Sequence, residues 1–520
     1  MATLDDKSQR MSRFALTLLL LLLLAAAHAA WHVQHDLRML AFPFPQDYVE
    51  GVTQLMQQRF NEGLTLYPIV SDQPPWLHNP YPPMGYWITH IVGRLTGTAH
   101  PYRAARLAAL LATLICAGLI FRLSACGRGR FCGFAAVGLF LFSPLVLRYG
   151  CFCRPDMLAL MFSLAAVAAL WNRRNAGLAA LAGVCAALAL LTKPQYFAAG
   201  LAISVHLFRN DRKLLAPFLA TLCGSCGLAL AMLHIQSDGA VWSHLFALNV
   251  LPFDWGGGMA RLADFAGRHA LLLTALILLL INPQKSSADE PPRDLAWMYG
   301  LCALLPLPLI AKTGAEENYL LELLAVGSLA AGRFASRLDG RTLTIGAALL
   351  AAQWLVYLPV QPQPVFSRTY GQELSSDFGA ITPTQMDRDI GGKIVEEFRM
   401  AEGDVLACDV GYVMLSGKPV IYQPFQFTQL ARSGRFDAEL LIERIESGSF
   451  ALIMLRGPAG TPEESDKDGA GLAPGDLPEA STAEEIQQSP FFTNAMLRVI
   501  NRHYALKRQI GPYFLYEPKI

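Results

Sequence analysis

Long apolar segments recur along the first 358 residues of the chain and then stop. The first runs from Phe14 to Ala30 and includes seven consecutive leucines. The others lie near residues 103–123, 131–149, 156–171, 176–192, 195–208, 214–235, 268–281, 295–311, 318–332 and 342–358. Because about 20 apolar residues are enough to cross a bilayer as a helix, this pattern predicts a polytopic α-helical membrane protein with about eleven transmembrane helices.

The first apolar segment has two interpretations. Ala27-His28-Ala29 fits the small-x-small cleavage site of a signal peptide. The segment also fits an uncleaved first membrane helix, which we favour because many more spans follow. Both interpretations place the next loop, residues 31–100, outside the cytoplasm.

The last part of the chain, residues 361–520, has a different pattern, and we call it the tail. It predicts helices at Ile390–Arg399, Phe436–Ser447 and Asn494–Tyr504, and strands at Asp404–Asp409, Pro419–Gln423, Phe450–Leu455, Leu506–Ile510 and Tyr513–Glu517. Such alternation indicates a small C-terminal α/β domain after a membrane domain of residues 1–360. Residues 458–490 are rich in Gly, Pro, Glu, Asp and Ser, which predicts a disordered insertion.

Composition and charge support a membrane protein and set its orientation. Hydrophobic residues make up 53% of the chain and charged residues 16%, against about 25% charged in soluble domains. The net charge of +1 gives no indication of nucleic-acid binding. Basic residues concentrate in short segments that alternate with longer ones, which predicts a cytoplasmic N-terminus and an extracytoplasmic tail. Nine of the ten cysteines lie between Cys116 and Cys302, mostly in apolar segments, and are expected to be small core residues.

Two carboxylates stand three residues apart near the start of the first outer loop, at Asp47 and Glu50. A carboxylate just outside the membrane can accept the proton of an attacking hydroxyl or amine. The alternative is a helix N-terminus, where acidic residues are favourable. Apolar residues recur at helical spacing from Val52 to Phe60, which predicts an amphipathic helix whose apolar face lies on the membrane surface.

An aromatic, proline-rich turn follows, from Asn79 to Trp87. Its Tyr81 and Tyr86 are candidates for stacking on a sugar or an isoprenoid. Simple anchoring at the headgroup level is the alternative, since aromatic side chains favour that level of a bilayer.

Basic side chains suited to a phosphate occur at two further outer boundaries. Arg154 and Asp156 lie in the loop 148–156, where arginine fits bidentate phosphate recognition. Asp156 could bind a metal, hold Arg154 or orient an acceptor, and a helix cap is the alternative for this loop. Lys193 lies in a very short outer turn, where it could bind a phosphate or extend to the interface.

The fourth candidate segment is polar and runs from residue 312 to 322. It contributes four substrate-binding candidates, namely Lys312, Glu317, Asn318 and Tyr319. Glu322 falls inside a predicted span and needs a partner there, for which Lys312 or Arg154 is expected. The sequence has no metal-ligand spacing and no phosphate-cradling glycine loop.

The order of these motifs resembles the GT-C superfamily of polyprenyl-phosphate-dependent glycosyltransferases. The resemblance rests on the acidic first loop, Tyr-Pro-Pro-x-x-Tyr-Trp from Tyr81, Arg-x-Asp from Arg154, the Thr-Lys turn at Lys193, and Gly-x-x-x-Asn-Tyr from Gly314. It covers about residues 10–360 and is closest to the bacterial branch related to protein O-mannosyltransferases and the lipid A aminoarabinose transferase.

This resemblance implies an inverting transfer from a polyprenyl-phosphate sugar to a lipid, glycan or protein acceptor, at the outer face of the bacterial inner membrane. Asp47 matches the catalytic aspartate of the family, with Glu50 as the alternative because many members place an acidic pair there adjacently. Asp156 matches the second acidic position, and Arg154 and Lys193 would hold the lipid phosphate. Some members use a divalent metal such as Mg²⁺ or Mn²⁺ and others do not.

Two other classes compete with a glycosyltransferase. A multi-span transporter or lipid flippase predicts internal repeats and charged or broken helices at mid-membrane. The sequence has no repeat, and its ionisable residues cluster at outer boundaries, which favours the enzyme. A non-catalytic relative of the superfamily, whose tail binds a partner, is the third interpretation.

Overall fold

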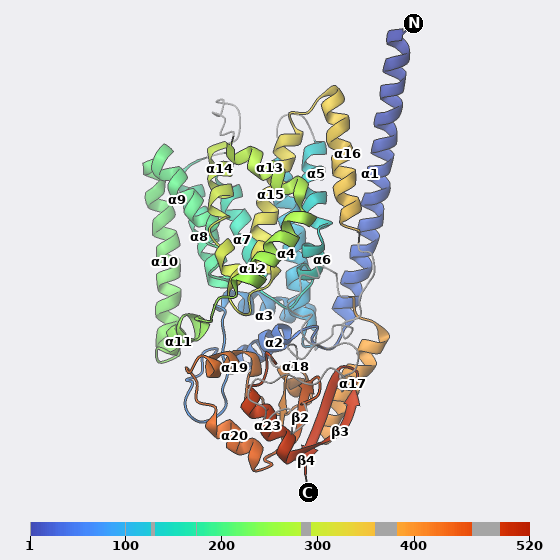
Figure 1. Ribbon diagram of the computed structural model, residues 1–520. Helices are drawn as coiled ribbons and strands as arrows, with labels where there is room; N and C mark the ends of the chain where they lie inside the picture. Colours follow the sequence, from blue (N-terminus) through green and yellow to red (C-terminus); the bar gives the residue numbers. More distant parts are fainter. Residues whose placement is uncertain are drawn as a thin grey trace.

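The protein is a bundle of helices that carries a smaller part, built of strands and helices, at one end (Figure 1). The computed structural model describes residues 2–98, 100–125, 130–172, 174–281, 293–358, 382–459 and 489–519. Most of the predicted disordered insertion, residues 460–488, lies outside these ranges. The N-terminal end of helix α1 projects from the bundle at the end opposite to the tail (Figure 1).

Each predicted apolar segment contains a helix. The bundle helices are α1 Ala2–Ala41, α4 Arg103–Ser124, α5 Arg130–Leu141, α6 Pro144–Tyr149, α7 Asp156–Ala169, α8 Ala176–Thr192, α9 Ala198–Asn210, α10 Arg212–Gln236, α13 Ala270–Ile281, α14 Arg293–Cys302, α15 Leu321–Ala335 and α16 Gly340–Val356. The segment 131–149 is broken because Ser143 caps a new helix at the amide of Leu145 and Pro144 supplies no donor.

Three helices in the described ranges are long and apolar enough to cross a membrane, at Ala15–Ala41, Arg103–Ser124 and Arg212–Gln236. A fourth span results if α12 (Trp255–Arg268) and α13 are counted together, although the pair is bent by 94°. The other bundle helices are shorter. The predicted number of eleven spans is therefore not confirmed.

Short helices cover the end of the bundle that faces the tail. They are α2 Tyr48–Asn61, α3 Met84–Thr96, α11 Ala240–Leu245, and the 3-10 helices η1 Ala247–Asn249, η2 Leu307–Ala311 and η3 Glu317–Leu320. The apolar face of α2 is buried, and Val52 and Met56 pack in one cluster with Tyr67, Tyr86 and Val410. The predicted place of this face on the membrane surface is wrong, because protein side chains cover it.

The tail contains a four-stranded sheet with the order β1-β2-β4-β3. Its strands are β1 Asp404–Ala407, β2 Phe450–Arg456, β3 Tyr504–Ile510 and β4 Tyr513–Pro518, and its helices are α17 Gln385–Met400, α18 Val410–Leu415, α19 Pro424–Arg432, α20 Glu439–Glu446 and α23 Asn494–His503. Strands β1 and β2 are parallel and the other pairs are antiparallel. The predicted strand Pro419–Gln423 is wrong, since it makes only an isolated bridge from Tyr422 to Trp76.

Helix α2 and the tail meet at two glycines. A Cβ atom on Gly51 would lie 2.7 Å from both Asp409 Oδ1 and the amide nitrogen of Gly411. The Cα atom of Gly51 is in turn 3.0 Å from the Cβ position of Gly411. Only residues without side chains allow this approach, so the helix that begins after Asp47 is held directly against the tail.

Candidate active site

A cavity of about 260 Å³ lies between the bundle and the tail. Six of the predicted site residues line it: Tyr81, Arg154, Lys193, Lys312, Asn318 and Tyr319. The tail supplies Gln423, Phe425 and Gln426 to the same lining. The structure thus brings together side chains from six separate parts of the chain: the first loop, Arg154, the turn at Lys193, and residues 245–251, 312–319 and 423–426.

Asp47 stands beside the cavity in a network of charges. Its Oδ2 atom is 2.5 Å from Arg154 Nη2, while its Oδ1 atom accepts the amide hydrogen of Glu50 at 2.9 Å and so caps α2. Arg154 Nη1 is also 2.8 Å from Glu316 Oε2. The helix cap that was the alternative role for Asp47 is therefore present, together with an ion pair to Arg154 in the loop 148–156.

The two carboxylates that share Arg154 differ in proton affinity. Burial raises the pKa of Asp47 above its ordinary value; Arg154 opposes this rise, and the charges of Glu316 and Glu50 add to it. Burial alone would also raise the pKa of Glu316, but Arg154 and Arg148 lower it to about 2. At neutral pH Glu316 is a fixed anion, and Asp47 is the more basic of the two.

Asp156 and Lys193 form a second ion pair in the site. Lys193 Nζ lies 2.6 Å from Asp156 Oδ1, which also accepts from Asn318 Nδ2 at 2.9 Å. The same ammonium group lies over the rings of Tyr81 and Tyr319, at 5.5 and 5.3 Å from the ring centres. Burial lowers the pKa of Lys193, although Asp156 opposes this effect. Its position between two aromatic rings leaves the ammonium group at the cavity wall.

Lys312 is the third cation of the lining. Its pKa is lowered by burial and by the charge of Lys193. No described Asp or Glu lies within ion-pair distance of Lys312. Arg154, Lys193 and Lys312 therefore line a cavity in which one cation has no anionic partner among the described residues.

A known protein family matches part of this chain by sequence, and solved structures match nearly all of it by fold. Residues 80–235 match the family described as dolichyl-phosphate-mannose-protein mannosyltransferase. No curated protein matches the sequence. Among solved structures, ArnT from Cupriavidus metallidurans in the apo state superposes with a TM-score of 0.58 at 13% identity, over 96% of this chain and 98% of ArnT. The ArnT structure bound to undecaprenyl phosphate gives a TM-score of 0.59 at 13% identity, over 95% and 97% of the two chains.

The chain has the GT-C fold. The fold that the resemblance implied from the order of short motifs is confirmed. The superposition extends over nearly the whole chain, so the tail belongs to the shared architecture together with the bundle.

Glu50, the alternative base, has a different place in this GT-C fold. Its carboxylate is fully buried and receives Arg106 at both oxygens, with contacts of 2.6 and 3.1 Å. The amides of Cys153 and Gln46 donate to it as well, at 2.7 and 2.9 Å. Neither oxygen is available to a substrate. Glu50 instead ties α2 to α4 and to the loop that carries Arg154.

Removal of this charge is expected to destabilise the protein strongly. In Glu50→Gln the buried guanidinium of Arg106 loses its counter-charge, which costs about 3–5 kcal/mol for a broken buried pair. Thermal unfolding of the purified full chain in detergent should show a clearly lower Tm. Glu62→Gln, at an exposed position just after the same helix, is the matched control and should leave the Tm unchanged. An unchanged Tm in Glu50→Gln would contradict the bracing role.

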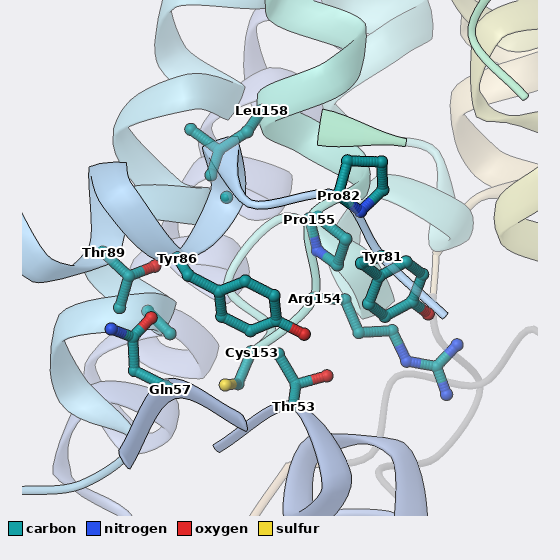
Figure 2. A pocket seen from close by; sticks show the side chains of 12 residues that line it. Thr53, Gln57, Tyr81, Pro82, Tyr86, Thr89, Cys153, Arg154, Pro155 and Leu158 are labelled. Carbon is teal, nitrogen blue, oxygen red and sulfur yellow. The ribbon is translucent and has the colours of Figure 1, made fainter. Parts of the chain in front are cut away.

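Three further predicted residues, besides Asp47, Glu50 and Asp156, do not line the main cavity. The hydroxyl of Tyr86 donates to Asn79 Oδ1 at 2.8 Å, and Tyr86 lines a second pocket, of about 20 Å³, together with Tyr81 and Arg154 (Figure 2). Glu317 pairs with Arg148 at 3.2 Å. Glu322 accepts from Ser163 and Tyr299, so the predicted pairing with Lys312 or Arg154 is wrong.

The carboxylates of the site do not fit a divalent metal. Each is paired with a cation: Asp47 and Glu316 with Arg154, Glu317 with Arg148, and Asp156 with Lys193. The described ranges contain no group of three or more His, Cys, Asp or Glu side chains placed to bind one ion. The chemistry proposed below is therefore built on the protein's own charges.

Sequence reasoning missed Glu316, Arg106 and the cavity residues of the tail. Glu316 adjoins the predicted Glu317 but is the one that reaches Arg154. An arginine at the start of an apolar helix, as at Arg106, is a usable sign of a buried partner. No local sequence pattern identifies Gln423 as a cavity residue, because its position depends on the contact between the tail and the first loop.

Proposed function

We propose that this chain is an inverting membrane glycosyltransferase that moves a sugar from a polyprenyl-phosphate donor to a lipid, glycan or protein acceptor. The observation that carries this proposal is the meeting of Arg154, Lys193 and Lys312 at one cavity, with Asp47 beside it. A cationic cavity next to a basic carboxylate suits a reaction that releases a phosphate and needs a proton acceptor. The GT-C fold, shared with an ArnT structure bound to undecaprenyl phosphate, supports the donor class.

The cations would hold the phosphate of the donor. Arginine offers a planar pair of donors that fits phosphate oxygens, and lysine offers a compact charge. As the bond between the anomeric carbon and the phosphate oxygen breaks, its electron pair moves to that oxygen. Fixed cations stabilise the negative charge that develops there.

Asp47 would act as the general base. The acceptor oxygen or nitrogen attacks the anomeric carbon from the face opposite to the phosphate, which inverts the configuration. Its proton passes to Asp47 Oδ2. A bound phosphate competes with Asp47 for Arg154, so donor binding frees this oxygen for the acceptor. Asp47 is preferred to Glu50 because both oxygens of Glu50 are engaged by Arg106 and backbone amides.

The rate is expected to fall in acid through a group with a raised pKa. A base must be ionised to accept a proton, and the pKa of Asp47 lies above its ordinary value. The acid limb of kcat/KM should therefore lie above pH 3.9, the usual value for aspartate. Glu316→Gln removes a negative charge that raises this pKa, so the limb should move to lower pH. An unchanged limb in that variant would contradict Asp47 as the titrating base.

The membrane orientation follows from charge and architecture. Basic residues favour a cytoplasmic N-terminus, and the cavity lies at the opposite end of the bundle beside the tail (Figure 1). We therefore place the cavity and the tail on the outer face of the bacterial inner membrane. The membrane domain would comprise residues 1–360 with about eleven spans, several of them short.

Lipids that accompany the purified protein test this function. Mass spectrometry of the full chain, purified in mild detergent, should find polyprenyl phosphate or its glycosylated form enriched over bulk phospholipid. The same lipid should be depleted in Lys193→Met. If no polyprenyl phosphate accompanies the wild-type protein even after addition of undecaprenyl phosphate to the membranes, the proposal fails.

A further inference from the structure

The proposed function does not specify which sugar is transferred, and the residues that line the cavity indicate its chemical class. Resting on that function, we propose that the cavity binds the donor's sugar as an uncharged, polyhydroxylated ring, recognised by Gln423 of the tail together with Asn318. Both side chains are almost fully buried, at 1% and 2% exposure, and both line the cavity. Each keeps one polar atom without a hydrogen-bond partner in the described ranges.

Gln423 offers a donor whose position is fixed. Its Oε1 atom accepts the amide hydrogen of His78 at 2.7 Å, which leaves Nε2 as the atom without a partner. The segment is joined to the first loop by hydrogen bonds from the amide of Trp76 to Ile421 O at 2.8 Å and from the amide of Gln423 to Trp76 O at 3.1 Å. The tail therefore holds an N–H group rigidly at the cavity.

Asn318 offers an acceptor in the same way. Its Nδ2 atom donates to Asp156 Oδ1 at 2.9 Å, and a carboxylate oxygen accepts hydrogen bonds, so the amide orientation is settled. Its Oδ1 atom is then the one without a partner. Gln423 of the tail and Asn318 of the bundle thus supply a free donor and a free acceptor to the same cavity.

A buried polar atom is costly unless a ligand satisfies it. A phosphate diester only accepts and an ammonium group only donates, whereas a hydroxyl group does both. Neighbouring hydroxyls on a sugar ring can accept from Gln423 and donate to Asn318. Aromatic rings of the lining, such as Tyr48 and Phe425, offer flat apolar faces to the C–H groups of such a ring.

Charge argues against a cationic sugar. The described lining contains Arg154, Lys193 and Lys312, and no aspartate or glutamate. An amino sugar would bring its ammonium group close to these cations, and the adjacent carboxylates, Asp47 and Asp156, are already paired with Arg154 and Lys193. A neutral hydroxylated sugar avoids this repulsion.

Position favours the donor's sugar over that of an acceptor. Asn318 binds Asp156, and the same Asp156 oxygen binds Lys193, a proposed phosphate ligand. The sugar joined directly to the phosphate lies within a few bonds of that ammonium group. Asn318 is therefore placed beside the leaving phosphate, where the transferred ring must lie.

Binding to the wild-type full chain in nanodiscs tests the sugar class without any variant. The probes are undecaprenyl methyl phosphate, which has the charge of the donor but no sugar, the same lipid phosphate carrying glucose, galactose or mannose, and one carrying a 4-amino-4-deoxy sugar. At least one neutral hexose should bind about tenfold more tightly than the methyl diester, as expected for two hydrogen bonds, and the amino sugar should bind less tightly than that hexose. Equal binding of the methyl diester and all hexoses, or a preference for the amino sugar, would overturn the inference. No binding of any lipid phosphate would overturn the proposed function, and this inference with it.

Gln423→Met then locates the contact. It should weaken binding of the preferred hexose lipid and raise the KM for the donor about three- to tenfold, with unchanged affinity for the methyl diester. Gln429→Met is the matched control, since Gln429 lies on α19 outside the lining and donates to Pro490 O. No change in Gln423→Met, equal loss for both lipids, or a change confined to the KM of the acceptor would contradict the assignment.

Discussion

Asp47→Asn is expected to lower kcat for sugar transfer about 10²–10⁴-fold, the contribution of a well-placed general base. Asparagine keeps an oxygen that can accept the amide hydrogen of Glu50, so the cap of α2 and the fold should survive. What disappears is the basicity of the Oδ2 atom that faces Arg154. Affinity for the donor should fall little or rise, because Arg154 is released to the phosphate.

The control for this variant is another capping aspartate. Asp254 caps α12 by accepting the amide hydrogen of Gly257, and it does not line the cavity. Asp254→Asn should retain transfer at the wild-type rate in membranes that supply the acceptor. Wild-type kcat in Asp47→Asn would exclude Asp47 as the base.

Lys193→Met is expected to lower kcat/KM for the donor about 10²–10³-fold, as for the loss of one fixed charge that stabilises the transition state. Methionine keeps an unbranched apolar stem between Tyr81 and Tyr319 but removes the ammonium group. The negative charge of Asp156 is then no longer compensated and repels the lipid phosphate. Both effects act against donor binding and against phosphate release.

Lys418→Met serves as the matched control for the loss of a lysine. Lys418 lies in the tail, where its ammonium group donates to the carbonyl of Ala401. Its replacement should leave kcat/KM unchanged. If Lys193→Met bound and used the donor as well as the wild-type protein, the proposed phosphate site would lie elsewhere.

The helices could be predicted because their signal is local. An apolar run sets its own helix, so the segments near 103–123 and 176–192 agree with α4 and α8 almost to the residue. Three of the tail helices, α17, α20 and α23, and the four strands of its sheet follow from local periodicity in the same way, whereas α18 and α19 were not predicted. Pro419–Gln423 failed because its backbone partner is Trp76 in the first loop rather than a strand of the sheet.

The pairings of the site could not be predicted from the sequence. Asp47 and Arg154 are 107 residues apart, and Glu50 and Arg106 are 56 apart. Sequence identified charged residues at one boundary of the membrane, and only the family resemblance favoured Asp47 over Glu50. The choice depends on which carboxylate is engaged by Arg106 and by backbone amides, and that follows from how α2 packs against α3 and α18.

A single-turnover experiment tests the central claim most directly. Membranes that contain the full chain and the cellular acceptors are incubated with undecaprenyl phosphate carrying a labelled sugar, and the fate of the label is followed. The account predicts that the wild-type protein moves the label from the lipid to an acceptor with inverted anomeric configuration, and that in Asp47→Asn the label stays on the lipid. A label that remains on the lipid with the wild-type protein, or a product of retained configuration, would contradict it.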